Sequence, residues 1–154
     1  MSQIRIRPGS SDDRPFVEHL GKRTLVDSVS AWRQSSPPML DVAFERLLGF
    51  VYDQPHHFYI AELDGRRAGF VLTITSMPDE VTLVPQAFIA YMGVEPEMRR
   101  AGIATELLKH TEQSARDLGM PYIALMVTEE NEAARNLYES AGYITERRLL
   151  CKIL

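Results

Sequence analysis

The sequence lacks three features that would place it in other classes of protein. Its 154 residues include one cysteine, Cys151, so an intrachain disulfide is excluded and no pair of cysteines is available for a zinc site. No stretch approaches the roughly 18 consecutive apolar residues of a membrane span, and residues 1–8 have no apolar run of the kind that a signal peptide needs. These absences predict a cytoplasmic protein with no membrane partner.

Basic residues are scarce relative to acidic ones. Lysine and arginine number 17 against 21 acidic residues, which gives a formal net charge of −4. A nucleic-acid-binding domain usually carries a basic excess, so no nucleic acid partner is expected. The acidic balance suits a cationic substrate, and it equally suits simple solubility. The length fits a single domain over residues 1–154.

The sequence does contain an alternation of strand-like and helix-like segments. Strands are predicted where apolar residues alternate or run continuously, and helices where they recur every three to four residues. The predicted strands are 3–7, 57–63, 68–75, 87–94, 122–127 and 143–154. The predicted helices are one that begins after a cap at Ser10 or Ser11, and then 39–52, 102–118 and 132–141.

The order of these segments predicts a mixed α+β fold. Strands 87–94 and 122–127 flank the helix 102–118, and a strand-helix-strand unit places its two strands parallel. The earlier strands 57–63 and 68–75 are joined by the tight-turn dipeptide Asp64-Gly65, which favours antiparallel pairing. We therefore expect a mixed, mostly antiparallel sheet with one parallel pair and helices on both faces.

The turn between strand 87–94 and helix 102–118 is chemically the most informative segment. The start of a helix offers unpaired N–H groups and a partial positive charge, which together bind a phosphate or pyrophosphate. The small residues Ala101, Gly102 and Ala104 allow close approach of the anion. Arg99 and Arg100 add positive charge beside it, and Thr105 can add a hydroxyl donor. An ordinary loop with two solvated arginines explains the composition equally well.

Two motifs in the sequence resemble those of a known family. Arg99-Arg-Ala-Gly-Ile-Ala104 resembles Q/R-x-x-G-x-G/A, the coenzyme A pyrophosphate signature of the GNAT superfamily of N-acetyltransferases. The stretch from Asn131 to Tyr143 is similar to that family's pattern N-x-x-A-x-x-x-Y-x-x-x-G-[FY]. The resemblance implies a GNAT-like sheet whose parallel pair splays apart. It also implies an enzyme that transfers acetyl from acetyl-CoA to a primary amine of a small molecule, peptide or protein by direct attack.

The resemblance also implies roles for individual residues. Tyr138 is the candidate general acid, because a phenol with a reference pKa of about 10 can protonate the leaving thiolate. Without the resemblance, Tyr138 reads as a core residue and Asn131 as a helix cap. The implied cofactor contacts are Met92, Val94, Arg99, Arg100, Ala101, Gly102, Ile103, Ala104, Thr105 and Asn131. A bulge is expected at the splay, and Gly93 permits one.

The sequence departs from the family pattern at the general base. Many relatives carry a carboxylate on the strand that enters the turn before helix 102–118, which we call the phosphate turn. Strand 87–94 contains none. Glu62, Asp79, Glu80 and a water held by Tyr91 are the candidates elsewhere. A non-catalytic acyl-CoA sensor and an interaction module with the same fold therefore stay open, and a possible homodimer follows from the resemblance alone.

Metal and thiol chemistry are not expected. The pair His56-His57 has no third ligand at a recognisable spacing. Cys151 is predicted to be a buried strand residue, and no adjacent base marks it as a nucleophile. Trp32, in the region that similar enzymes use for the acceptor, either stacks on a substrate or packs.

Overall fold

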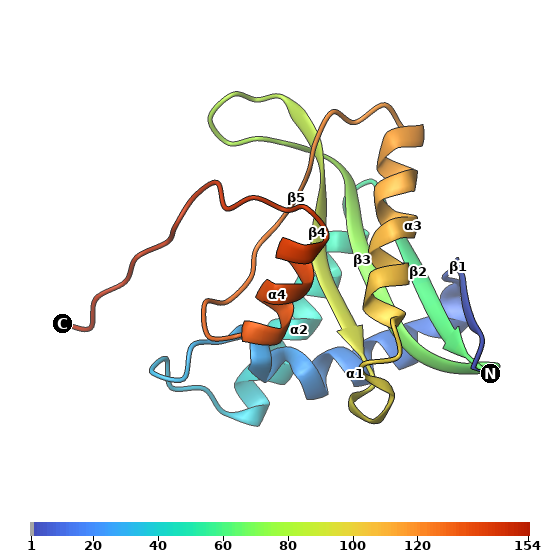
Figure 1. Cartoon of the computed structure of the whole chain (residues 1–154). Helices are drawn as coiled ribbons and strands as arrows, with labels where there is room; N and C mark the ends of the chain where they lie inside the picture. Colours follow the sequence, from blue (N-terminus) through green and yellow to red (C-terminus); the bar gives the residue numbers. More distant parts are fainter. Residues whose placement is uncertain (1) are drawn as a thin grey trace.

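A computed structural model of the chain describes residues 2–154. It consists of one β-sheet with helices on either side (Figure 1). The strands are β1 Ile4–Pro8, β2 His56–Leu63, β3 Arg66–Pro78, β4 Pro85–Val94 and β5 Ile123–Leu125. The helices are α1 Arg14–Thr24, α2 Pro37–Tyr52, α3 Ile103–Asp117 and α4 Glu132–Ser140, with the 3₁₀ turns η1 Ser11–Asp13, η2 Leu25–Ser28 and η3 Pro96–Met98.

The five strands lie side by side in the order in which they occur along the chain. Neighbours from β1 to β4 are antiparallel, whereas β4 and β5 are parallel because α3 connects them as a crossover. Asp64 and Gly65 form the β2–β3 turn with φ values of 51° and 82°, as their dipeptide predicts. The predicted mixed, mostly antiparallel sheet is confirmed.

Two apolar clusters fill the space between the sheet and its helices. Successive side chains of a strand point to opposite faces, so β2 and β3 contribute to both clusters. The cluster on the face of α1 and α2 has a core of Val17, Leu20, Phe44, Leu48, Val51, Ile60, Phe70, Leu72 and Ile74. The cluster on the face of α3 has a core of Ala61, Ala68, Val71, Ile89, Ile103, Leu107 and Leu108. Helices therefore cover both faces, as predicted.

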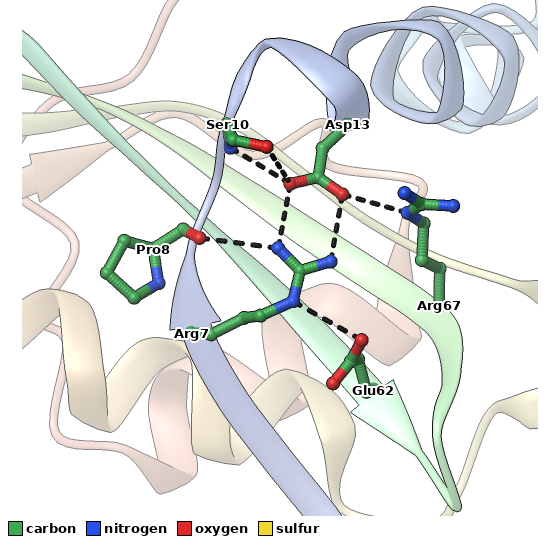
Figure 2. A network of polar contacts seen from close by, with 6 residues as sticks. All are labelled: Arg7, Pro8, Ser10, Asp13, Glu62 and Arg67. Carbon is green, nitrogen blue, oxygen red and sulfur yellow. Dashed lines mark hydrogen bonds and ion pairs between the residues drawn. The ribbon is translucent and has the colours of Figure 1, made fainter.

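An ion-pair network surrounds the buried Asp13 carboxylate next to β1 (Figure 2). The Asp13 carboxylate is 1% exposed and accepts hydrogen bonds from both Nη atoms of Arg7, at 2.7 and 2.9 Å, and from Arg67 Nε at 2.8 Å. Ser10 N donates to the same carboxylate at 2.9 Å, and Arg7 Nε pairs with Glu62 at 3.3 Å. These partners, Arg7 above all, hold the pKa of Asp13 well below its usual range. The network ties β1 and η1 to β2 and β3.

Several boundary predictions at the other edge were wrong. Within residues 141–154 the structure has no strand, although 143–154 was predicted to form one. Cys151 is exposed rather than buried in a strand. β5 covers three residues instead of the predicted six, while β3 runs on to Pro78, three residues past its predicted end at residue 75. A strand requires a hydrogen-bonded neighbour, and β-propensity alone cannot supply one.

Candidate functional site

β4 extends well beyond the strand that pairs with it. The parallel ladder between β4 and β5 has three positions and ends at Ile89 and Leu125. β4 continues from Ala90 to Val94, a length of about 16 Å, with no strand of the described residues on that side. The structure therefore contains the predicted splay of the parallel pair, and one edge of β4 is open.

The main-chain groups of Met92 and Val94 face this open edge. Glu95 N donates to Ala68 O on β3 at 2.7 Å, so the main chain of Glu95 faces β3. Main-chain groups alternate along a strand, which directs those of Val94 and Met92 to the opposite side. The Arg99 guanidinium confirms this direction, because its Nε donates to Val94 O at 3.5 Å. An extended ligand could pair with these groups as an added strand does.

A β-bulge lies where the splay begins. Leu72 and Thr73 are consecutive on β3, but their partners on β4 are Tyr91 and Ile89. Ala90 is therefore the extra residue of the bulge. Ala90 and Tyr91 both direct their side chains to the cluster of α1 and α2. The bulge was expected to use Gly93 and lies three residues earlier. A bulge of this kind needs no positive φ, so it does not require glycine.

The turn that follows β4 presents a row of unused N–H groups. Arg100 and Gly102 adopt left-handed φ values of 66° and 85°, and α3 begins directly afterwards. The first bond of the helix runs from Glu106 N to Gly102 O at 3.1 Å. No acceptor within residues 2–154 bonds the N–H groups from Arg100 to Thr105. Ile103 is buried in the core and anchors this arrangement, which suits an anion.

The phosphate turn is linked to η2 by an ion pair. Arg99 Nη2 lies 3.6 Å from Asp27 Oδ2, and both side chains are about half exposed. Three further contacts join this region to the connection between β5 and α4. They are Thr128 Oγ1 to Ser28 O at 2.6 Å, Ala31 N to Glu130 Oε2 at 3.1 Å and Asn131 Nδ2 to Asp27 O at 3.4 Å. Sequence reasoning missed these contacts, because their partners are about 70 to 100 residues apart.

Asn131 and Tyr138 hold α4 against the body of the protein. Asn131 Oδ1 accepts from Ala134 N at 3.2 Å, which confirms that Asn131 caps α4. The Tyr138 ring meets the Tyr143 ring edge to face at 5.8 Å, and Tyr138 packs on the α3 cluster that also receives the side chain of Met92. Burial raises the pKa of Tyr138, so its phenol is protonated at neutral pH.

Tyr91 is a hydrogen-bond donor held in a fixed position. Its hydroxyl lies 2.6 Å from Thr24 Oγ1, which itself donates to Leu20 O at 2.9 Å. Thr24 has a single hydroxyl proton, so Tyr91 is the donor of the shorter bond. Burial above all raises the pKa of Tyr91 to about 12, so its phenol is protonated at neutral pH.

The carboxylates considered as general bases lie elsewhere. Glu62 belongs to the network at the β1 edge, two strands away from β4. Asp79 and Glu80 both pair with Arg147, at 2.9 and 3.2 Å. The carboxylate directly after β4, Glu95, is paired with Arg23 at 2.8 Å. The structure brings none of the three predicted candidates to the splay.

The described part of the chain offers neither a cluster of metal ligands nor a membrane-spanning helix. Residues 2–154 contain no group of three metal-ligating side chains. None of their helices combines the length and apolar character that crossing a bilayer requires.

A family model supports the resemblance seen in the motifs. The model described as "Acetyltransferase (GNAT) family" matches residues 25–143, which include the splay, the phosphate turn and Tyr138. The chain belongs to the GNAT acetyltransferase family. It is therefore an acyltransferase enzyme.

Relatives of similar length support the same conclusion. An uncharacterized N-acetyltransferase of Methanocaldococcus jannaschii is 32% identical over 148 residues, which cover 96% of this chain and 81% of that protein. An acetyltransferase of Pectobacterium atrosepticum is 31% identical over 142 residues, which cover 92% and 89%.

Solved structures share the GNAT fold. A protein from Pyrococcus furiosus assigned as an acetyl transferase superposes with a TM-score of 0.83 at 24% identity, covering 99% of this chain and all of that one. An aminoglycoside N-acetyltransferase solved in complex with CoA superposes with a TM-score of 0.72 at 19% identity, covering 100% and 96%.

Proposed function

We propose that this GNAT enzyme transfers an acetyl group from acetyl-CoA to a primary amine of a small molecule, peptide or protein. One observation carries the proposal: the unbonded N–H groups from Arg100 to Thr105 lie at the start of α3, directly after the open edge of β4. A pyrophosphate and an extended amide chain are the two parts of coenzyme A that such an arrangement would bind. The structural neighbour solved with CoA supports this assignment.

Each part of the proposed site has a distinct role toward the cofactor. The backbone of the turn, Ala101 to Thr105, would hold the pyrophosphate, and Arg99 and Arg100 would add charge beside it. The main-chain groups of Met92 and Val94 would pair with the pantetheine arm. Asn131 would contact the cofactor from the α4 side. No metal is needed for any of these contacts.

The reaction requires one proton to be delivered and one to be removed. Acetyl-CoA supplies an activated thioester, in which the C–S bond breaks as the amine nitrogen forms a bond to the carbonyl carbon. Tyr138 would donate its phenol proton to the leaving sulfur, and its raised pKa keeps that proton in place until then. A water on the lone pairs of Tyr91 would take up the proton that the acceptor nitrogen loses.

A thermal-shift measurement tests the cofactor site. Acetyl-CoA at about 100 times its Kd stabilises a protein by roughly 2.7 kcal/mol, which raises the Tm of a domain of this size by about 5–10 °C. Gly102→Glu should abolish the shift, because it places a negative charge where the pyrophosphate binds. Gly119→Glu is the matched control: Gly119 also has a positive φ, 75°, with open space around it, but lies at the other end of α3. Loss of the shift in both variants would contradict the assignment.

The sequence left open a coenzyme A sensor without catalysis, which the family assignment disfavours. That alternative predicts a thermal shift with acetyl-CoA but no acetyl-CoA consumption over a broad panel of amines. An interaction module that kept only the fold predicts no shift at millimolar acetyl-CoA. Turnover with any amine of the panel, measured as free coenzyme A thiol, would exclude both.

A further inference from the structure

A carboxylate that was not among the predicted bases lies beside the splay. Asp27 belongs to η2, and its Oδ2 is 3.6 Å from Arg99 Nη2. The Nε atom of the same arginine donates to Val94 O at 3.5 Å, on the open edge of β4. One arginine therefore joins the Asp27 carboxylate to a main-chain group that we propose for the pantetheine arm.

The hydroxyl of Tyr91 shows which side of the sheet Asp27 is on. Tyr91 packs in the cluster of α1 and α2, and its hydroxyl lies 2.6 Å from Oγ1 of Thr24, the residue before η2. Burial is the main cause of the raised pKa of Tyr91; the negative charge of Asp27 adds to the rise, whereas the positive charge of Arg99 opposes it. Tyr138 packs in the cluster on the opposite face. An acceptor that approaches from the side of η2 would therefore meet Asp27 while the sulfur leaves toward Tyr138.

The backbone of Asp27 is held in place while its carboxylate stays accessible. Asp27 O accepts a hydrogen bond from Asn131 Nδ2 at 3.4 Å, and the adjacent Ser28 O accepts one from Thr128 Oγ1 at 2.6 Å. These bonds fix η2 against the connection between β5 and α4. The Asp27 side chain itself is 52% exposed, so a molecule from the solvent can reach it.

The carboxylates nearest to Asp27 have partners that play no part in the proposed site. Glu95, which follows β4, is paired with Arg23 at 2.8 Å. Glu130, on the connection between β5 and α4, accepts from Ala31 N at 3.1 Å. The partner of Asp27 is different, because it is one of the two arginines that we propose to attract the pyrophosphate.

Binding of acetyl-CoA would draw Arg99 away from Asp27 for two reasons. A pyrophosphate at the phosphate turn carries more negative charge than one carboxylate and accepts paired hydrogen bonds from a guanidinium. The pantetheine arm would also pair with the main chain at Val94, whose carbonyl oxygen Arg99 contacts. After Arg99 has moved, the Asp27 carboxylate lacks a cation, and one supplied by the acceptor can take its place.

We propose that Asp27 binds a positive charge of the acceptor, in the position that the Arg99 guanidinium holds in the structure. The nitrogen that attacks the thioester has to be neutral, so the charge that meets Asp27 belongs to a second group of the same molecule. The acceptor is therefore a molecule with two or more amino groups. The inference rests on the proposed acetyl transfer and adds to it a residue that selects the acceptor.

Pairs of amines test this selection. The probes are linear diamines, each compared with the monoamine of equal length, because only the diamine keeps a positive charge when its reacting amine is neutral. A charge-assisted hydrogen bond to Asp27 should favour the diamine roughly 10- to 100-fold in kcat/KM. The preference should largely disappear in Asp27→Asn and return in part in Asp27→Glu.

Glu45→Gln is the matched control for the amine pairs. Glu45 is also a half-exposed carboxylate in an ion pair, but it lies on α2 and pairs with Lys22. This variant should keep the preference of the parent protein. Equal kcat/KM for diamines and monoamines in the parent, or a preference that persists in Asp27→Asn, would overturn the proposal.

Binding of acetyl-CoA separates this role of Asp27 from a structural one. An exposed ion pair contributes little, so its loss in Asp27→Asn should free Arg99 and tighten acetyl-CoA binding about 2- to 5-fold, measured by titration calorimetry. If Asp27 only held Arg99 in place for the cofactor, the variant would bind acetyl-CoA more weakly. Weaker or unchanged binding would therefore contradict the proposal. A parent protein that binds no acetyl-CoA, or that binds it and acetylates no amine, would instead overturn the proposed function.

Discussion

The two edges of the sheet satisfy their polar groups in opposite ways. At the β1 edge, the buried Asp13 carboxylate accepts hydrogen bonds from two arginines and a backbone N–H, all within the chain (Figure 2). At the β4–β5 edge, N–H groups from Arg100 to Thr105 have no acceptor in the described residues and β4 runs on unpaired. Polar groups near the core are normally bonded, so a cluster that is not bonded marks a place for a ligand. The first edge uses its polar groups to hold the fold together, and the second is where we propose that the cofactor binds.

The largest effect on catalysis without an effect on stability is expected from Tyr138→Phe. Removal of the proposed proton donor should lower kcat on the order of 100-fold, equivalent to about 2.7 kcal/mol in the barrier. Acetyl-CoA affinity and the unfolding midpoint should be nearly unchanged, since the ring and its contact with Tyr143 remain. Steady-state kinetics with thermal-shift titration measures both quantities. Tyr59→Phe is the control, and weaker cofactor binding with an unchanged kcat would contradict the role of Tyr138.

Asp13→Asn should have the converse effect. Loss of the charge leaves Arg7 and Arg67 without their shared anion, and breaking a buried ion pair costs roughly 3–5 kcal/mol. The arginine side chains are 22% and 44% exposed, so water offsets part of that loss and we expect about 2–3 kcal/mol. Urea unfolding measures the change. The neighbouring exposed Asp12→Asn should change stability by less than about 0.5 kcal/mol, and kcat of folded Asp13→Asn enzyme should stay at the parent value.

The same carboxylate predicts the response of stability to acid. The pKa of Asp13 is lower in the folded protein than its unfolded value of about 3.9, so ionised Asp13 stabilises the fold above that pH. The contribution is lost as the pH falls through the lower folded pKa. The stability difference between parent and Asp13→Asn should be constant from about pH 8 to 5 and should shrink below about pH 4. A difference that does not change with pH would mean that the charge of Asp13 is not what stabilises the edge.

The smallest effect is expected at the centre of the sheet, between the two edges. Thr73 on β3 is buried, and its hydroxyl has no hydrogen-bond partner among the described residues. Thr73→Val keeps the branched shape and removes the unpaired hydroxyl, so stability should be unchanged or should rise by up to about 1 kcal/mol. Urea unfolding checks the sign. A clear loss of stability would show that this hydroxyl is satisfied, for example by an ordered water.

Local chemistry was enough to predict the elements that carry the site. The glycine and small residues of the phosphate turn predicted where α3 starts, and Gly102 does precede it with φ 85°. Asn131 was predicted to cap α4 and does so. Asp64-Gly65 was predicted to make a tight turn and does. Each of these depends on a few consecutive residues, whose backbone preferences act whatever the rest of the chain does.

Features that depend on distant partners were not predictable in the same way. Asp13 lies close to the predicted helix start at Ser10 or Ser11, but nothing in that local sequence indicates that its charge is met by Arg67, 54 residues further on. The bulge at Ala90 reflects how two strands align, and neither strand alone records the register. The segment 143–154 has the composition of a strand but lacks a neighbour in its own chain.

The sequence by itself determined the order of helices and strands up to residue 140, the turn at Gly102 that starts α3 and the cap of α4. These follow from backbone sterics and hydrogen bonding over a few residues. Only the tertiary structure decided that β5 stops at Leu125, that Met92 and Val94 face an open edge, and that Arg7, Asp13 and Arg67 meet in one network. Those outcomes depend on which strands pair and which charged side chains meet. Contacts between residues far apart in the sequence decide both.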